Sequence, residues 1–470
     1  MRSLRSRRNT ELVLVLVAVA LGMFGYAEAT LALRGAVSGS LVPVGAGLGA
    51  LAVAAHLAVR RWAPYADPLI LPLGVVLSSL GLMLIARLDI SYKARYPHSS
   101  PGVPGAPGQV MWLCVGAVAF IAVLGLLTHH RVLQRYSYVT MAAALALLLA
   151  PALFPGDTYG AKRWIFVGPL SLEPDEFVKI AIAIFFAGYL MANGGALALV
   201  GRRVWGLRLP HGRTLGPIVA VWAVSLLVLV FENDLGTSLI FFGVFIVMLY
   251  IATERVSWVV LGVLMAGLGA GVVGSLSPHV AARVVAWRHP MAIFLPPDRR
   301  PPGLISDQSA QALFSLGSGG VLGSGLGQGQ PWLIGFAGRS DFILTTVGEE
   351  LGLAGMTAVL LLYALLIERG VRTALVLTDP FGKLLAAGLA ATLCLQVFVV
   401  TGGVTGLIPL TGKALPFLAQ GGSATVANWV LVGLLVKLSN AAGRTAHEQS
   451  RAGAPPPTAD ALTAVVRPVT

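Results

Sequence analysis

Long apolar runs recur along the whole chain and constrain its fold more than any other feature. The clearest runs cover residues 12–27, 68–85, 110–127, 141–153, 180–191, 239–251, 358–366 and 384–400. A helix that crosses a bilayer needs about 20 mostly apolar residues, and several runs reach that length with their flanks. Only helices or closed barrels satisfy their backbone amides in hydrocarbon, and these runs lack the alternation of barrel strands. The sequence therefore predicts an all-α polytopic membrane protein.

Composition supports this prediction. Only 11% of the 470 residues are charged, whereas a soluble domain carries about 25%. The net charge is +13, but the basic residues punctuate the apolar runs and form no single stripe, so no nucleic-acid partner is expected. Cys114 and Cys394 lie inside apolar runs and are expected to be small buried hydrophobic residues rather than a disulfide or metal ligands.

We predict about twelve spans, a core of about ten preceded by about two additional N-terminal helices. The first run follows several arginines, as in a signal peptide, but it is long and no clear cleavage site followed by a soluble domain appears. We interpret it as a retained helix. The spans are centred near residues 22, 48, 77, 119, 146, 183, 223, 244, 266, 355, 393 and 432.

The distribution of Lys and Arg predicts the orientation. Short cytoplasmic loops are rich in these residues, and every second connection carries them, so both termini are expected in the cytoplasm. The same alternation places the long loop at 277–341 outside. Its basic residues do not conflict with this placement, because long loops are exempt from the rule. Three regions follow: a basic segment with two extra helices (1–65), a core (66–445), and a cytoplasmic tail (446–470) that is expected to be disordered.

Arg163 and Trp164 end the sequence Gly-Ala-Lys-Arg-Trp, which is expected at the outer surface just before a span. The guanidinium of Arg163 offers a two-pronged contact for phosphate, and Trp164 offers an interfacial ring. These five residues alone favour interfacial anchoring.

Three ionisable residues are expected near the outer ends of spans. Glu176 and Lys179 are three apart, which places both on one helix face about one turn inside the membrane. Ionisable residues at that depth usually face a cavity, but a structural ion pair is equally favoured here. Asp234 is a natural N-cap for the next helix, so capping is favoured over lining the outer cavity.

The end of the long outer loop holds a glycine-rich segment and a carboxylate. The glycines at 317–329 let a backbone approach a ligand closely. No βαβ context accompanies them, so a nucleotide-binding fold is excluded, and turn or hinge roles stay open. Asp341 stands where the loop returns to the membrane, placed to cap a helix, accept a hydroxyl proton or hold a divalent cation.

The polar motifs follow one another in a fixed order. They are Gly-Ala-Lys-Arg-Trp at 160–164, Glu-Pro-Asp-Glu-Phe-Val-Lys at 173–179, Asp-Leu-Gly-Thr at 234–237, Gly-Ser-Gly-Gly at 317–320, Ser-Asp-Phe-Ile at 340–343, Gly-Glu-Glu-Leu-Gly at 348–352, Thr-Gly-Leu-Ile-Pro-Leu-Thr-Gly at 405–412 and Gly-Gly-Ser at 421–423. In this order they resemble the SEDS proteins (shape, elongation, division and sporulation), typified by RodA and FtsW. The match covers about residues 67–440. The two extra leading helices are similar to those of RodA-type members from actinobacteria.

The resemblance implies an activity and a partner. SEDS proteins are peptidoglycan glycosyltransferases that polymerise lipid II at the outer face of the cytoplasmic membrane. They work with a class B penicillin-binding protein, which crosslinks the product. The family's functional positions fall on Arg163, Trp164, Glu176, Lys179, Asp234 and, for its essential aspartate, Asp341. The chain departs from the family where Arg339 and Ser340 replace His-Thr, but the aspartate is kept.

The resulting hypothesis is lipid II polymerisation for cell elongation and shape. Arg163, Lys179 and Arg283 stabilise the departing pyrophosphate, and the glycine-rich loop with Gln328 closes around the sugar. Asp341 activates the 4-hydroxyl of the acceptor, directly or through a divalent cation such as Mg²⁺ or Mn²⁺; no other cofactor is implied. The alternatives are a flippase for lipid II or another polyprenyl-linked precursor, and a non-catalytic scaffold for the transpeptidase.

Overall fold

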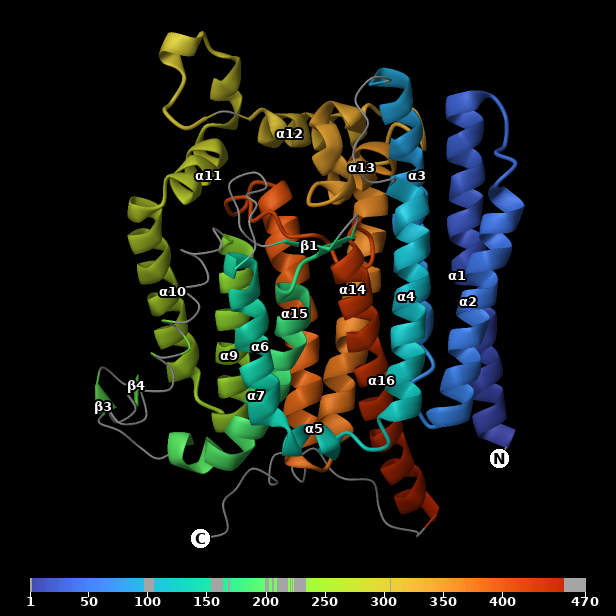
Figure 1. Ribbon diagram of the computed structural model, residues 1–470, viewed down its shortest axis with the longest axis vertical. Helices are drawn as coiled ribbons and strands as arrows, with labels where there is room; N and C mark the ends of the chain where they lie inside the picture. Colours follow the sequence, from blue (N-terminus) through green and yellow to red (C-terminus); the bar gives the residue numbers. More distant parts are fainter. Residues whose placement is uncertain are drawn as a thin grey trace.

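The structure is a computed structural model, in which long helices run side by side (Figure 1). It describes residues 2–96, 105–153, 164–167, 170–198, 203–204, 207–208, 219, 221, 223, 234–304 and 306–451. The long helices are α1 (Arg2–Arg34), α2 (Leu41–Trp62), α3 (Ile70–Arg95), α4 (Gly105–Leu126), α6 (Ser137–Leu153), α7 (Asp175–Ala198), α9 (Leu235–Thr253), α10 (Val256–Leu276), α14 (Gly352–Val376), α15 (Pro380–Val404) and α16 (Gly422–Arg451).

Short elements join the long helices. The short helices are α5 (Arg131–Arg135), α11 (Pro278–Arg288), η1 (Pro290–Phe294), η2 (Pro297–Arg299), α12 (Gln308–Gly319), η3 (Pro331–Arg339) and α13 (Ile343–Glu350). Two small antiparallel hairpins pair β1 (Ile165–Val167) with β2 (Leu170–Leu172) and β3 (Arg203–Val204) with β4 (Leu207–Arg208).

The predicted fold class, an all-α polytopic membrane protein, is confirmed. Nine helices of the described chain are long and apolar enough to cross a membrane: α1, α2, α3, α4, α7, α9, α10, α15 and α16. The other expected spans fall on α6, which has 17 residues, on α14, and near residue 223, where most of the chain lies outside the described residues. The total of about twelve spans therefore stays a prediction.

Burial separates central helices from peripheral ones. Of the apolar stretch of each helix, 89% is buried in α3, 83% in α16 and 78% in α15, but only 28% in α2 and in α10. Figure 1 shows α1 and α2 together at one side of the bundle, next to α3 and α4. The two leading helices therefore attach to a core that is built around α3, α15 and α16.

The cysteines depart from the expectation of burial. Both are free thiols, and Cys114 is partly exposed while Cys394 is exposed. Both lie in helices that are long and apolar enough to cross a membrane, so hydrocarbon is the expected neighbour of their exposed sides. A small apolar side chain is as well placed against lipid as against protein, which removes the reason to expect burial.

Substitution of Gly81 tests the packing of α3 in the core. A Cβ at Gly81 would lie 2.5 Å from the carbonyl oxygen and 2.6 Å from Cα of Leu418. The backbone would have to move, at a cost of about 1–3 kcal/mol. We expect Gly81→Ala to lower the Tm of the purified protein in detergent. Gly47→Ala in α2 is the matched control, because nothing lies within 4 Å of its added Cβ; equal Tm values for the two variants would contradict this packing.

Candidate active site

The segments that carry the predicted site residues gather at one end of the bundle. Figure 1 shows β1, α11, α12 and α13 at this end, whereas α5, the start of α1 and the end of α16 lie at the opposite end. Trp164 is partly buried and directly precedes β1. Arg163 lies outside the described residues.

Asp341 occupies the turn between η3 and α13 and is partly buried. Its Oδ1 accepts a hydrogen bond of 2.7 Å from Oγ of Ser340. The amides of Ser340 and Phe342 both donate to the carbonyl of Ala337, at 3.0 and 3.1 Å, and close the turn. The N-cap of α13 is Phe342. Asp341 therefore stands one residue before the cap position that was considered for it.

Arg339 anchors the same turn. Its Nη1 lies 2.5 Å from Oδ1 of Asp89 in α3, and its guanidinium carbon lies 5.3 Å from the ring centre of Tyr92. The carbonyl of Arg339 accepts a hydrogen bond of 2.8 Å from the amide of Gln420. Arg339 thus ties the approach to Asp341 to α3 through its guanidinium, and to the segment that precedes α16 through its carbonyl.

The glycine-rich turn is held by a buried ion pair. Nε of Arg87 in α3 donates to Oε1 of Glu350 at 2.6 Å, and both side chains are fully buried. The amide of Gly327 donates to the same oxygen at 3.0 Å, and Nη2 of Arg87 donates to the carbonyl of Gly329 at 2.7 Å. Gln328, between these two glycines, is exposed. The turn therefore presents Gln328 at the surface of the protein.

Glu176 and Lys179 form the ion pair that their spacing predicts. Nζ of Lys179 lies 2.5 Å from Oε2 of Glu176, and both side chains are buried. The same ammonium donates to Oε1 of Gln396 in α15 at 2.8 Å and to Oδ1 of Asn428 in α16 at 2.9 Å. The pair therefore joins α7 to α15 and α16, and its contact with substrate stays a prediction.

A second buried cluster surrounds Lys413, which sequence reasoning missed. Its Nζ lies 3.0 Å from Oδ2 of Asp234 and 3.2 Å from Oε1 of Glu173, and it contacts Oδ2 of Asp175. Oγ1 of Thr237 lies 2.7 Å from Oδ2 of Asp175 and 2.9 Å from Oδ2 of Asp234, so its one proton bridges these two carboxyl groups. The available signal was an ionisable residue that directly follows a polar motif close to an apolar span.

Asp234 caps α9, as expected from its sequence position. Its Oδ1 accepts a hydrogen bond of 3.0 Å from the amide of Thr237. The side chain is completely buried and its other oxygen faces Lys413. Asp234 thus joins the start of α9 to the lysine cluster, and its contact with substrate stays a prediction.

The charge state of Lys413 follows from its surroundings. Burial acts to lower the pKa of the ammonium, but the carboxylates of Asp175, Asp234 and Glu173 raise this pKa well above its ordinary value. Lys413 lies between α15 and α16, outside the spans, and stays protonated at neutral pH. The ammonium gives the three acidic side chains a shared cationic partner, which buried acidic groups require.

These carboxylates also bear on the expected cation. Oxygens of Glu173, Asp175 and Asp234 lie within 4.8 Å of one another, and in the described chain this is the acidic group with metal-binding spacing. The ammonium of Lys413 lies among them and already supplies a positive charge. Asp341, for which holding a divalent cation was one of the expected roles, is outside this group. A cation at Asp341 therefore stays a prediction.

Arg283 of α11 binds backbone carbonyls of the chain that leads to Lys413. Its Nη1 donates to the carbonyls of Thr411 at 2.6 Å and of Leu410 at 3.3 Å. One turn later, Nε1 of Trp287 donates to the carbonyl of Gly406 at 2.7 Å. The structure thus gives Arg283 a role in holding the loop, and its contact with pyrophosphate stays a prediction.

These clusters meet on residues 405–421, the segment that joins α15 to α16. Thr411 accepts from Arg283, and Lys413 pairs with the carboxylates. The carbonyl of Ala414 accepts from Gln396 at 3.0 Å, and Gln396 is a partner of Lys179. Gln420 donates to Arg339. A single segment therefore connects the turn of Asp341 with both buried lysines.

Comparison with known proteins identifies the family. The family model for the FtsW, RodA and SpoVE proteins, described as cell cycle proteins, matches residues 68–443. The chain belongs to this family. The matched range contains Asp341, Lys413 and the other described site residues, and the resemblance inferred from the polar motifs is confirmed.

Curated members of the FtsW/RodA/SpoVE family are similar over most of the chain. The peptidoglycan glycosyltransferase RodA of Mycobacterium tuberculosis is 42% identical over 455 residues, which cover 96% of this chain and 94% of the relative. RodA of Mycobacterium leprae is 41% identical over 71% of this chain and 69% of the relative. The probable peptidoglycan glycosyltransferase FtsW of Trichlorobacter lovleyi is 31% identical over 68% of this chain and 79% of the relative.

Solved structures of the family share the fold. A chain from a peptidoglycan synthase complex that coordinates polymerisation and crosslinking superposes with a TM-score of 0.58 at 22% identity, covering 80% of this chain and 97% of that chain. The rod shape determining protein RodA of Thermus thermophilus gives a TM-score of 0.54 at 20% identity, covering 80% and 96%. At these identities the likeness establishes the fold alone.

Removal of the Lys413 charge tests the buried cluster. We expect Lys413→Met to destabilise the protein by about 3–5 kcal/mol, because the carboxylates lose their partner. A lower Tm in detergent at pH 7 measures the effect. Asp175→Asn in the same chain should restore part of the Tm, since it removes one uncompensated charge. Lys437→Met in α16 is the control, because Lys437 forms none of the ion pairs found in the described chain; a loss equal to that of Lys413→Met would contradict the cluster's role.

The sign of the pH dependence follows from the raised pKa. A lysine whose pKa is raised on folding stabilises the protein fully below its unfolded pKa of about 10.4. This contribution is lost as the pH rises through the folded pKa. Between pH 7 and 10 the Lys413 contribution to the Tm of the wild type should therefore stay constant.

Proposed function

We propose that this chain is a peptidoglycan glycosyltransferase that polymerises lipid II into glycan strands for cell elongation and shape. Family membership and the names of relatives that match 96% of the chain support the proposal. The observation that carries it is the position of Asp341. Its carboxylate is partly buried at the end of the bundle, is oriented by Ser340, and directly precedes the N-cap residue of α13.

In the proposed reaction, Asp341 accepts the proton of the acceptor 4-hydroxyl as that oxygen attacks the anomeric carbon of the donor sugar. The bond from this carbon to the diphosphate breaks, and undecaprenyl diphosphate leaves with the bonding electron pair. Each turnover adds one disaccharide. The hydrogen bond from Ser340 fixes the carboxylate that must reach the hydroxyl, which lowers the entropic cost of the step.

Cations are proposed to stabilise the diphosphate as its negative charge grows. Arg163 and Arg283 are assigned to this contact, with Trp164 at the interface and Gln328 at the sugar. Glu176, Lys179 and Asp234 were also expected to contact the substrate. Because all three are buried in paired networks, we propose that they shape the inner wall of the site. A divalent cation at Asp341 would stabilise the same developing charge.

The proposed arrangement in the cell follows from the two ends of the bundle. The end with α11, α12 and α13 is assigned to the outer face of the cytoplasmic membrane, and the end with α5, the start of α1 and the end of α16 to the cytoplasm. The proposed partner is a class B penicillin-binding protein that crosslinks the glycan. A related fold occurs in a synthase complex that coordinates these two reactions, which supports this assignment.

Loss of the Asp341 carboxylate should abolish polymerisation. We expect Asp341→Asn to lower the rate by about 10²–10⁴-fold, the usual contribution of a general base. The measurement is glycan synthesis from labelled lipid II by the purified protein with its penicillin-binding protein partner. Asp298→Asn is the matched control, because Asp298 is an acid of the same outer segment, 76% exposed.

The outcome separates the proposal from its alternatives. Wild-type polymer with none from Asp341→Asn, and full activity in Asp298→Asn, supports the assignment. Polymer of normal length from Asp341→Asn would remove the proposed base. If the wild type makes no polymer but moves lipid II across a bilayer, the flippase is the correct function and the polymerase is not.

Cysteine labelling tests the orientation. In a chain that carries Cys114→Ala and Cys394→Ala, we expect Asp298→Cys to react with a membrane-impermeant maleimide on intact cells. Arg135→Cys in α5 should react only after the membrane is permeabilised. The reverse pattern would place Asp341 on the cytoplasmic side and contradict the proposed reaction.

A further inference from the structure

A pocket separates the leading helix pair from the core. It is partly open at its edge: about 440 Å³ of empty space, part of it outside the protein, lies between walls from α1, α2, α3, α4 and α16. Apart from Ser78, Ser79 and Trp429, every residue of the wall is aliphatic. Leu48 and Leu51 of α2 are only partly buried, so this wall borders the bilayer. The pocket is therefore an apolar compartment next to lipid, and no charged side chain lines it.

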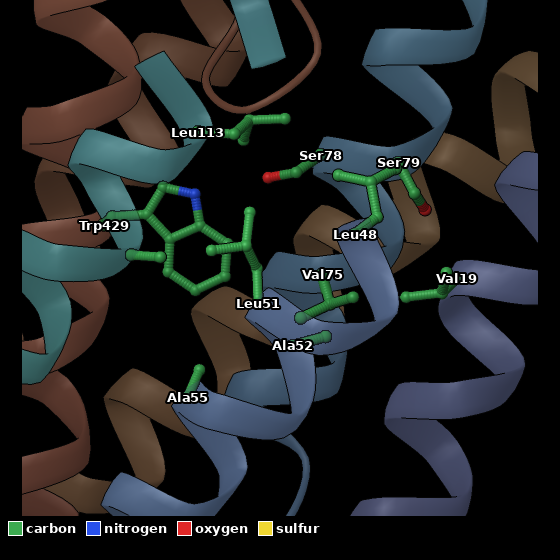
Figure 2. Close-up of a pocket in the computed structure, with 11 residues that line it drawn as sticks. Val19, Leu48, Leu51, Ala52, Ala55, Val75, Ser78, Ser79, Leu113 and Trp429 are labelled. Carbon is green, nitrogen blue, oxygen red and sulfur yellow. The ribbon is translucent and has the colours of Figure 1, made fainter. Parts of the chain in front are cut away.

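Two buried polar atoms face this compartment without a partner. Oγ of Ser78 and Nε1 of Trp429 make no hydrogen bond in the structure, although each residue is only 5% exposed. Figure 2 shows the hydroxyl of Ser78 and the indole nitrogen of Trp429 turned toward each other across the pocket. The hydroxyl of Ser79, the next residue, is by contrast used within the protein and donates to the carbonyl of Ala18 at 2.9 Å. An unpaired buried donor is costly, and hydrocarbon offers no water to relieve it.

The packing around Trp429 fixes the direction of its indole. A Cβ at Gly116 in α4 would lie 2.9 Å from Cδ1 of Trp429, so α4 passes close to the ring. Phe120 and Phe417 meet the ring nearly at right angles, with centres 5.6 and 6.2 Å away. The N–H group is therefore held toward the pocket, where it has no hydrogen-bond acceptor in the structure.

We propose that the pocket binds an uncharged lipid that presents one oxygen to Trp429 and Ser78 and its hydrocarbon to the aliphatic wall. The indole is a donor only, so the ligand atom must be an acceptor. The absence of charged residues from the wall excludes an ionic head group, which would be buried unpaired. A hydroxyl of a long-chain alcohol or the carbonyl of an acyl ester supplies this oxygen. The site is independent of the proposed polymerase reaction.

Photolabelling tests the proposal on the full-length protein. The protein in phosphatidylcholine nanodiscs is exposed to an 18-carbon alcohol that carries a diazirine on its chain, and labelled peptides are mapped by mass spectrometry. We expect labels on the pocket-facing parts of α2, α4 and α16. Unlabelled oleyl alcohol should compete, octadecene should not, and methyl oleate distinguishes an ester from an alcohol.

Single substitutions identify the polar contact. Trp429→Phe and Ser78→Ala should each reduce labelling about fivefold, the factor expected from the loss of one neutral hydrogen bond. Ser79→Ala is the matched control and should keep the label, because its hydroxyl is already used within the protein. Equal competition by octadecene, or unchanged labelling in Ser78→Ala, would mean that the two groups hold a water or nothing, and would overturn the proposal.

Discussion

The buried ammonium of Lys413 is the contact on which the arrangement of the site depends. Three carboxylates from the starts of α7 and α9 surround it, and each would be strongly destabilised without it. Their attraction holds these helices to residues 405–421. The same segment receives Arg283 from α11, and its Gln420 binds the carbonyl of Arg339. The position of Asp341 is thus set partly by a charge that lies in another part of the chain.

Ion pairs determine which helices become neighbours, because apolar contacts do not distinguish one neighbour from another. Lipid tails are as apolar as leucine side chains, so hydrophobic burial gives little preference for one helix neighbour over another within a bilayer. A buried charge, in contrast, requires a partner at a defined position. Arg87 with Glu350 selects the neighbour of α3, and Lys179 with Glu176 selects those of α7 through Gln396 and Asn428. The polar residues of the family motifs therefore determine the assembly of the helices as well as the chemistry at their ends.

Sequence reasoning succeeds where an interaction is local and fails where it is not. Apolar runs gave the helices, and helical periodicity gave the pair at 176 and 179, because both depend on neighbours within one turn. Lys413 and Asp175 are 238 positions apart, and Arg339 and Asp89 are 250 apart. Such partners follow from the fold and not from spacing, so Lys413 was missed and Arg339 was noted only as a departure from the family pattern.

The leading helix pair shows why a binding pocket forms at its boundary with the core. Polar contacts fasten the pair: Glu11 lies 2.8 Å from His56, Arg8 binds the carbonyl of Ala66, and Ser79 binds that of Ala18. Between these contacts a lipid chain fills space as well as a side chain does, so a gap costs the folded protein little. A gap that arises from imperfect packing alone is expected to be lined only by apolar atoms. The convergence of two unpaired polar groups on this one is what distinguishes a site for a specific lipid from imperfect packing.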